Sequence, residues 1–302
     1  MNSGFLWFGA SNHLNFGANT DSFLGIGSGF LTDRNVESLK SSFSEYFEFL
    51  NNYNIFNIEI NTEIEQLSPG IISNVIIPAL KNSNIKKVSV HLPYLQLNPA
   101  SPLEEYRQFS SKSIIKVIKA FDGYSIDSFV IHLTSEFEDS IMLFPIPEYN
   151  KKALINIALS QIKKSLDDIF ENTAISPERL ALENLEVFPF DLLYNIIKDY
   201  RISICFDMGH WGLNGFMPEE FFERFDPEKI REIHIQGMTE ERQGLRTFIR
   251  REHQSLDKGI LNAGYFFNYL LNINFKGSLI IENRSKAELI ESLEFLKRNY
   301  FL

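Results

Sequence analysis

Short apolar runs alternate with longer amphipathic stretches along most of the chain. The apolar runs are rich in Ile and Val, which is typical of buried strands. Eight of them predict strands, at residues 5–10, 55–60, 87–91, 128–132, 180–183, 202–207, 232–235 and 278–282. Eight amphipathic stretches predict helices, at residues 36–52, 69–82, 103–120, 151–170, 189–199, 218–226, 260–272 and 285–298.

Strict alternation of strands and helices predicts a parallel sheet, and eight such units are the number that closes a barrel. The rival architecture, a doubly wound open sheet, usually carries a glycine-rich phosphate turn after its first strand. Here the first apolar run is followed by Gly9-Ala10-Ser11-Asn12, which lacks that fingerprint. We therefore expect a (β/α)8 TIM barrel that forms a single domain over residues 1–302.

The charge and cysteine content narrow the class of protein. A formal net charge of −10 gives no general attraction to a phosphate backbone, which disfavours nucleic acid as a partner. The only cysteine, Cys205, excludes an intrachain disulfide and a thiolate metal cluster. No segment resembles a signal peptide or reaches the length of a membrane span. We therefore expect a cytoplasmic protein with no membrane partner.

Histidines and carboxylates gather where the predicted strands end, and five of the six histidines lie there or in the following loop. These positions converge at the C-terminal mouth of a barrel. A single histidine at a strand end is more often structural than a ligand, but the collection over six strands favours a site for Zn²⁺, Mn²⁺ or Fe²⁺. The candidate ligands are His91, His132, Glu183, Asp207, His210, His234, His253 and Glu282.

Other residues near the strand ends have two interpretations each. His13 follows the first predicted strand, where turn structure is the simpler explanation. Glu59 and Glu63 flank the end of the second predicted strand, and Glu59 faces either the barrel interior or a helix. Tyr94 and Trp211 closely follow His91 and His210, so they either line the pocket or pack in the core.

The segment 240–252 is highly charged, which usually indicates a solvated surface loop. It also joins His234 to His253, and an arginine within it could reach a substrate phosphate or carboxylate. Arg242, Arg246, Arg250 and Arg251 are the arginines concerned. Arg246, Arg251 and Tyr94 are the residues that we expect to bind substrate.

In their order along the chain, these motifs resemble the xylose isomerase-like barrel superfamily, which includes endonuclease IV and sugar epimerases. The resemblance covers nearly the whole sequence. It rests on His91-Leu92-Pro93-Tyr94, Ile131-His132, Leu182-Glu183-Asn184, Asp207-Met208-Gly209-His210, Ile233-His234, the stretch from His253 to Gly259, and Ile281-Glu282.

The resemblance implies a shared metal ion on Glu183, Asp207, His234 and Glu282. In the endonuclease IV branch a second ion shares the first Glu and uses two histidines, which match His91 and His132. A third ion there uses two histidines, matching His210 and His253, together with an Asp. Counting back from His253, that Asp position holds Arg251, an arginine that could instead bring positive charge to a substrate.

Further details resemble the cobamide-remodelling phosphodiesterases of the same superfamily. They are the His-Leu-Pro of the third predicted strand, Glu-Asn-Leu after the fifth, and Cys-x-Asp-x-Gly-His at the sixth. The ending Ile281-Glu282-Asn283-Arg284-Ser285, with Ser292-Leu293, belongs to the same set.

Three functions remain open on this basis. The preferred one is a metal-dependent hydrolase acting on a phosphoester, with one to three divalent ions per chain and two favoured. The alternative is a single-metal sugar or sugar phosphate isomerase, epimerase or dehydratase, in which Glu183 and Glu282 exchange a proton at carbon. The third is a barrel that binds a ligand without catalysis. In each case we expect a small phosphorylated or sugar-like partner.

Overall fold

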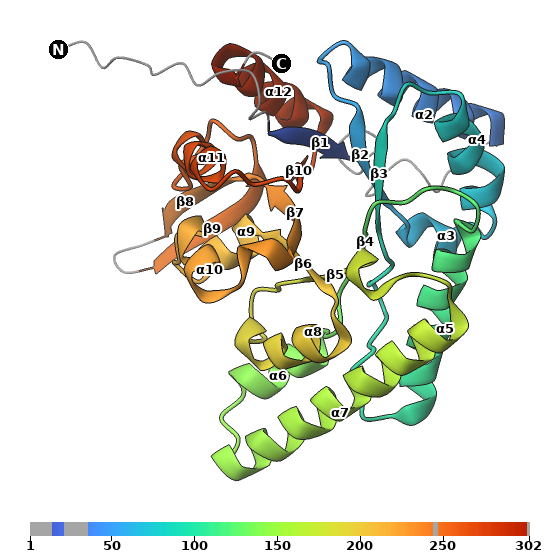
Figure 1. Ribbon diagram of the computed structural model, residues 1–302. Coiled ribbons are helices and arrows are strands. Elements are labelled where there is room, and N and C mark those ends of the chain that lie inside the picture. Colours follow the sequence, from blue (N-terminus) through green and yellow to red (C-terminus); the bar gives the residue numbers. More distant parts are fainter. Residues whose placement is uncertain (1–13, 21–35, 244–246, 301–302) are drawn as a thin grey trace.

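Eight parallel strands close into a barrel in the computed structural model, which describes residues 14–20, 36–243 and 247–300 (Figure 1). Neighbouring strands follow the chain order around the barrel, and the last barrel strand pairs with the first. The strands are β1 (Asn15–Asn19), β2 (Asn57–Asn61), β3 (Lys87–His91), β4 (Phe129–Ile131), β5 (Leu180–Glu183), β6 (Ser203–Asp207), β7 (Ile230–Ile235) and β10 (Ser278–Ile281). This confirms the predicted TIM barrel.

Each of the eight predicted amphipathic stretches contains a helix. The helical segments are α2 (Val36–Asn51), α3 (Glu63–Leu67), η1 (Ile72–Ile76), α4 (Ile77–Lys81), α5 (Glu104–Ala120), α6 (Glu136–Leu143), α7 (Glu148–Asn172), η2 (Pro177–Arg179), η3 (Phe190–Leu192), α8 (Tyr194–Tyr200), α9 (Met208–Leu213), α10 (Pro218–Arg224), η4 (Pro227–Lys229), α11 (Ala263–Asn272) and α12 (Lys286–Tyr300). Within the described residues, no helix combines the length and the apolar character needed to cross a membrane.

Three short helices that the sequence pattern did not predict follow strand ends at the mouth of the barrel. They are α3, α6 and α9, which come after β2, β4 and β6. Each is too short to show a helical period of apolar residues. They place Glu63, Asp139 and His210 at the same end of the barrel as the candidate ligands.

The first barrel strand is not the one that the sequence predicted. Residues 5–10 lie outside the described residues, and Asn15–Asn19 closes the barrel between β2 and β10. Apolar and polar residues do not alternate in this strand, because a glycine allows close packing in its middle and an asparagine ends it. A side chain at Gly17 would meet Ile280 and the backbone of Asn57, and the Asn19 amide donates to Glu59 at 2.6 Å. Apolar periodicity therefore could not identify it.

The barrel interior is filled in layers, because alternate residues of a strand point inward. Val130, Ala181 and Cys205 form one buried apolar cluster on β4, β5 and β6. Two residues further along the same strands stand His132, Glu183 and Asp207. Small side chains thus lie directly below the candidate metal ligands, and Cys205 is one of these core residues.

An antiparallel hairpin is inserted between β7 and α11 in place of the predicted surface loop (Figure 1). It consists of β8 (Gly237–Gln243) and β9 (Thr247–Gln254). Its charges pair across the two strands, with Arg250 2.9 Å from Glu240 and Arg251 3.3 Å from Glu241. A run of paired charges lacks the apolar alternation that predicts a strand, which explains why the pattern indicated a loop.

Candidate metal centre

Four predicted ligands meet at the bottom of the barrel mouth, and we call them the inner cluster: Glu183, Asp207, His234 and Glu282. Their donor atoms all lie within 4.8 Å of one another. His234 Nδ1 is 3.1 Å from Glu183 Oε1, 3.3 Å from Glu282 Oε2 and 3.7 Å from Asp207 Oδ2. Because β5, β6, β7 and β10 end at one level, residues far apart in the chain converge here.

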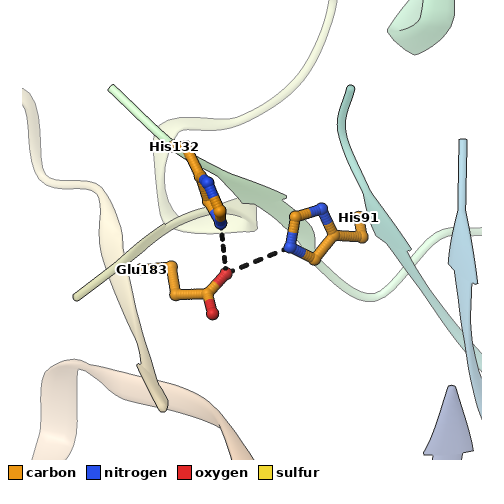
Figure 2. A group of neighbouring side chains, drawn as sticks. All are labelled: His91, His132 and Glu183. Carbon is orange, nitrogen blue, oxygen red and sulfur yellow. Dashed lines mark hydrogen bonds and ion pairs between the residues drawn. The ribbon is translucent and has the colours of Figure 1, made fainter. Parts of the chain in front are cut away.

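A pair of histidines, His91 and His132, approaches the other oxygen of Glu183 (Figure 2). Glu183 Oε2 lies 2.9 Å from His132 Nε2 and 3.1 Å from His91 Nε2. Its Oε1 faces His234 instead. The two oxygens of one carboxylate therefore face two separate sets of donors, the inner cluster and the histidine pair.

A third set of donors lies further out and is here called the outer cluster: Glu186, His210 and Glu252, with His253 beside it. His210 Nδ1 is 3.1 Å from Glu252 Oε2 and 3.2 Å from Glu186 Oε1. His253 Nε2 is 3.4 Å from Glu252 Oε1. The sequence indicated both histidines but neither carboxylate.

The backbone of His253 explains why Glu252 was missed. His253 has a left-handed φ of 58°, which is unusual for a residue other than glycine and costs roughly 1–3 kcal/mol. This conformation breaks the strand alternation, so Glu252 and His253 both line the cavity although they are adjacent. Arg251, which occupies the position of the family's Asp in the resemblance, does not line the cavity, whereas Glu252 does.

Two of the arginines considered for substrate binding, Arg250 and Arg251, do not line the cavity. Arg251 is more than half exposed and pairs with Glu241, outside the cavity lining. Arg250 donates to the carbonyls of Gly212 and Leu213 at the end of α9, which fixes the hairpin to the helix that carries His210. Arg246, like His13, falls outside the described residues. Among the described residues, the arginine that lines the cavity is Arg284, which the sequence indicated only as part of a family motif and not as a substrate-binding residue.

The cavity above the barrel has a volume of about 710 Å³, within the range of pockets that hold small molecules. Tyr94 lines it, with its ring 4.5 Å from the ring of His132 and 5.2 Å from that of His91. Glu63 fixes the loop that follows β3, since its carboxylate accepts hydrogen bonds from the backbone N–H groups of Tyr94 and Leu95. Trp211 does not line the cavity. It is buried, and its indole donates to the carbonyl of Met217.

Hydrogen bonds to backbone carbonyls orient two of the histidines for metal binding. His91 Nδ1 faces the carbonyl of Leu92 at 3.0 Å, and His253 Nδ1 faces the carbonyl of Glu282 at 3.3 Å. A carbonyl only accepts, so Nδ1 carries the proton in both rings. In the neutral imidazole the Nε2 lone pair then points at a carboxylate, an arrangement that a cation between them stabilises.

The whole mouth is short of positive charge. Burial lowers the pKa of His91, yet the hydrogen bond and charge of Glu183 outweigh burial and raise this pKa to about 10. Carboxylates likewise outweigh burial at His253, raising its pKa to about 9, and they raise the pKa of His210, with Asp207 first among them. The pKa of His234 is raised by Cys205 and by carboxylates that include Glu59 and Glu183. His132 is the exception, because burial lowers its pKa. Carboxylates that draw protons onto four imidazoles fit a site built for divalent cations.

His234 is oriented by a carboxylate below it, that of Glu59. Glu59 is fully buried on β2, with Oε2 3.0 Å from His234 Nε2 and Oε1 accepting from Asn19. A carboxylate in this position holds the Nε2 proton and leaves Nδ1 to face the inner cluster. Glu59 thus faces the barrel interior, one of the two orientations considered for it.

Replacing Glu59 by Gln is expected to weaken metal binding at the inner cluster by about 10–100-fold. The amide keeps the volume but offers one acceptor oxygen where two are used, so the His234 ring is held less firmly. Competition with a chromophoric chelator measures this affinity. Glu65→Gln is the control, since this buried carboxylate accepts from the backbone of Gly70 and Ile72, away from the site. Equal affinity in Glu59→Gln and wild type would contradict the role of Glu59.

Comparisons with known proteins agree with this architecture. An uncharacterized protein of Methanocaldococcus jannaschii, MJ1311, is 27% identical over 271 residues, covering 86% of this chain and 84% of its own. A D-tagatose 3-epimerase-like protein has a similar structure, with a TM-score of 0.68, 24% identity and coverage of 95% of this chain and 97% of its own. The IOLI protein, solved with a binding zinc atom, gives a TM-score of 0.62 at 13% identity, covering 96% and 100%.

A family model described as a xylose isomerase-like TIM barrel matches residues 65–299. This range contains the strands β3 to β7 and β10 and all the residues of the inner cluster, the histidine pair and the outer cluster. It includes more than three quarters of the chain. The chain therefore belongs to the family of xylose isomerase-like TIM barrels.

Proposed function

We propose that this protein is a metal-dependent hydrolase that cleaves a phosphoester of a small molecule. The observation that carries the proposal is the division of Glu183 between two sets of donors, with His91 and His132 at one oxygen and the inner cluster at the other. Proton transfer at a sugar carbon needs a single ion, and the inner cluster alone has donors enough for it. The histidine pair and the outer cluster supply ligands that a hydrolase with two or three ions uses.

The proposed roles of the residues follow from where they lie. The inner cluster and the histidine pair would each hold one ion, with Glu183 contributing to both sets, and the outer cluster would suit a third. When bound, such ions neutralise the phosphate, lower the pKa of the attacking water and stabilise the leaving oxygen. Tyr94 packs against both histidines of the pair and limits access of solvent to them. Arg284 at the rim pairs with Glu252 and is placed to meet an anionic substrate group.

The charge of the cavity favours a small substrate over nucleic acid. Six carboxylates line it, and Arg284 is the only Lys or Arg among the described lining residues. Proteins that hold DNA or RNA rely on several Lys and Arg contacts to successive phosphates. A substrate with one phosphate at the donor clusters, and neutral or cationic groups beyond it, fits this lining better. The carboxylates are Glu136, Asp139, Glu183, Glu186, Glu252 and Glu282.

A sugar epimerase or isomerase is the second candidate. Glu183 and Glu282 both belong to the inner cluster, so two carboxylates flank the place where one ion would hold a sugar. The D-tagatose 3-epimerase-like protein shares the fold. In this alternative His91 and His132 bind sugar hydroxyls.

Metal content and substrate class together test the proposal. The protein is loaded with Zn²⁺ or Mn²⁺, freed of excess metal, and assayed by elemental analysis. It is then tested on bis(p-nitrophenyl) phosphate and, in parallel, on the ketoses D-tagatose and D-fructose. We expect two or three ions per chain and hydrolysis of the phosphodiester. One ion per chain, with epimerisation of a ketose and no hydrolysis, would replace the hydrolase by the epimerase.

A further inference from the structure

Gln236 joins the inner cluster to the backbone that carries the outer ligands. It is fully buried just after β7. Its Nε2 donates to both carboxylate oxygens of Asp207, at 3.0 and 2.8 Å, and its Oε1 accepts the backbone N–H of His253. The nitrogen end of its amide therefore acts on the inner cluster, while its carbonyl oxygen acts on the hairpin.

His253 is held in its left-handed conformation from two sides. Gln236 binds its N–H, and the amide of Asn283 donates to its carbonyl at 3.1 Å. This conformation lets both Glu252 and His253 face the cavity. Without a fixed N–H, His253 would relax towards an ordinary strand, in which neighbouring side chains point to opposite sides.

Gly209 provides the space that Gln236 occupies. A Cβ at this position would lie 2.5 Å from Nε2 and 2.7 Å from Oε1 of Gln236, well inside van der Waals contact. Gly209 is in α9 and immediately precedes His210. In a helix Ala is normally more favourable than Gly, so a glycine here loses helix stability in return for room beside Gln236.

We propose that Gln236 is a positioning residue that fixes the geometry of the outer cluster relative to the inner one, and that Gly209 is the residue that admits it. The function of the outer cluster as an ion site rests on the proposed hydrolase, but the coupling itself is a property of the fold. Loss of Gln236 leaves Glu183, His234 and Glu282 in place, and Asp207 still accepts the backbone N–H of His210. The N–H of His253, in contrast, loses its partner. The effect therefore falls mainly on the outer cluster.

The test compares Gln236→Ala, Gly209→Ala and the double variant in the full-length protein. Two readouts are used, metal titration and hydrogen exchange at the backbone of residues 251–254. We expect each single variant to weaken the weakest-bound ion by about 10–100-fold, as loss of a ligand-orienting partner does. Exchange at the His253 amide should become faster in both. The double variant should be no worse than Gln236→Ala, because the added methyl group then has no side chain to displace.

A volume control separates positioning from simple packing. Gln236→Met fills similar space without either hydrogen bond, so it should resemble Gln236→Ala in both readouts. If Gln236→Met kept wild-type ion binding and exchange, or if the losses from Gly209→Ala and Gln236→Ala added, the proposal would be overturned. A wild type that binds one ion contradicts the proposed hydrolase, and exchange at His253 still decides the role of Gln236: unchanged exchange in Gln236→Ala overturns it.

Discussion

Replacing Glu183 by Gln is expected to lower the rate of phosphodiester cleavage by on the order of 10³-fold, the size of effect seen when a principal electrostatic group is lost. Glu183 Oε2 faces His91 and His132, whereas Oε1 faces His234. An amide keeps one oxygen and turns the other into an N–H donor that cannot bind a cation. One substitution thus removes a ligand from either the histidine pair or the inner cluster, and removes the negative charge from both.

The measurement is kcat for phosphodiester cleavage together with metal content by elemental analysis. Both should fall in Glu183→Gln. Glu136→Gln is the matched control, since this carboxylate lines the same cavity but is exposed and belongs to none of the three donor sets. It is expected to stay within a few-fold of wild type. Full metal content and near-normal activity in Glu183→Gln would contradict the shared role of this carboxylate.

That the residues of the inner cluster and the histidine pair meet at one mouth could be predicted, because strand geometry fixes where such residues point. Their division into two sets was what the family resemblance implied. A histidine or carboxylate at the end of a buried strand has only two directions, and the C-terminal ends of all barrel strands share one mouth. Reading the apolar runs was enough to place His91, Glu183 and Asp207 at strand ends that the structure brings together. Small errors in strand bounds did not matter, because the ends of the runs were right.

The outer cluster could be predicted only in part, since it depends on backbone that has no periodic signal. Glu252 reaches the cavity because one residue, His253, leaves the strand conformation. Glu186 lies in the irregular segment after β5, and His210 lies in α9, a helix of six residues. Such features are set by contacts distant in sequence, here the hydrogen bonds of Gln236 and Asn283, and residue spacing does not encode them.

Polar residues inside the barrel hide strands from an apolar pattern. β1 ends in Asn19, whose amide binds Glu59, and Glu59 in turn holds His234. Because a polar network lies below the metal ligands, polar residues occupy inward positions that would otherwise be apolar. The polar residues that support the site therefore make the strand beside it hard to recognise, and the apolar pattern predicts the more apolar residues 5–10 in its place.

Removing both His91 and His132, each replaced by Ala, is expected to release one metal equivalent and to abolish phosphodiester cleavage, while the inner cluster keeps its ion. The two imidazoles approach the same oxygen of Glu183 and none of the oxygens of Asp207 or Glu282 in the described contacts. A hydrolase that stabilises both the attacking and the leaving oxygen needs the second ion. Cleavage should therefore be abolished although one ion per chain is still bound. Elemental analysis and the diester assay on the same preparation measure both.

The double variant distinguishes the hydrolase from the epimerase because His91 and His132 have a different role in each. In a one-ion epimerase His91 and His132 bind sugar hydroxyls, so their removal raises KM for a ketose and leaves the metal content unchanged. In the hydrolase their removal lowers the metal content and kcat, so a higher concentration of substrate does not restore the rate. Tyr94→Phe is the control, since it keeps the ring that packs on His132 at 4.5 Å and should retain every bound ion. Full metal content in the double variant, together with a KM effect on a ketose, would decide for the epimerase.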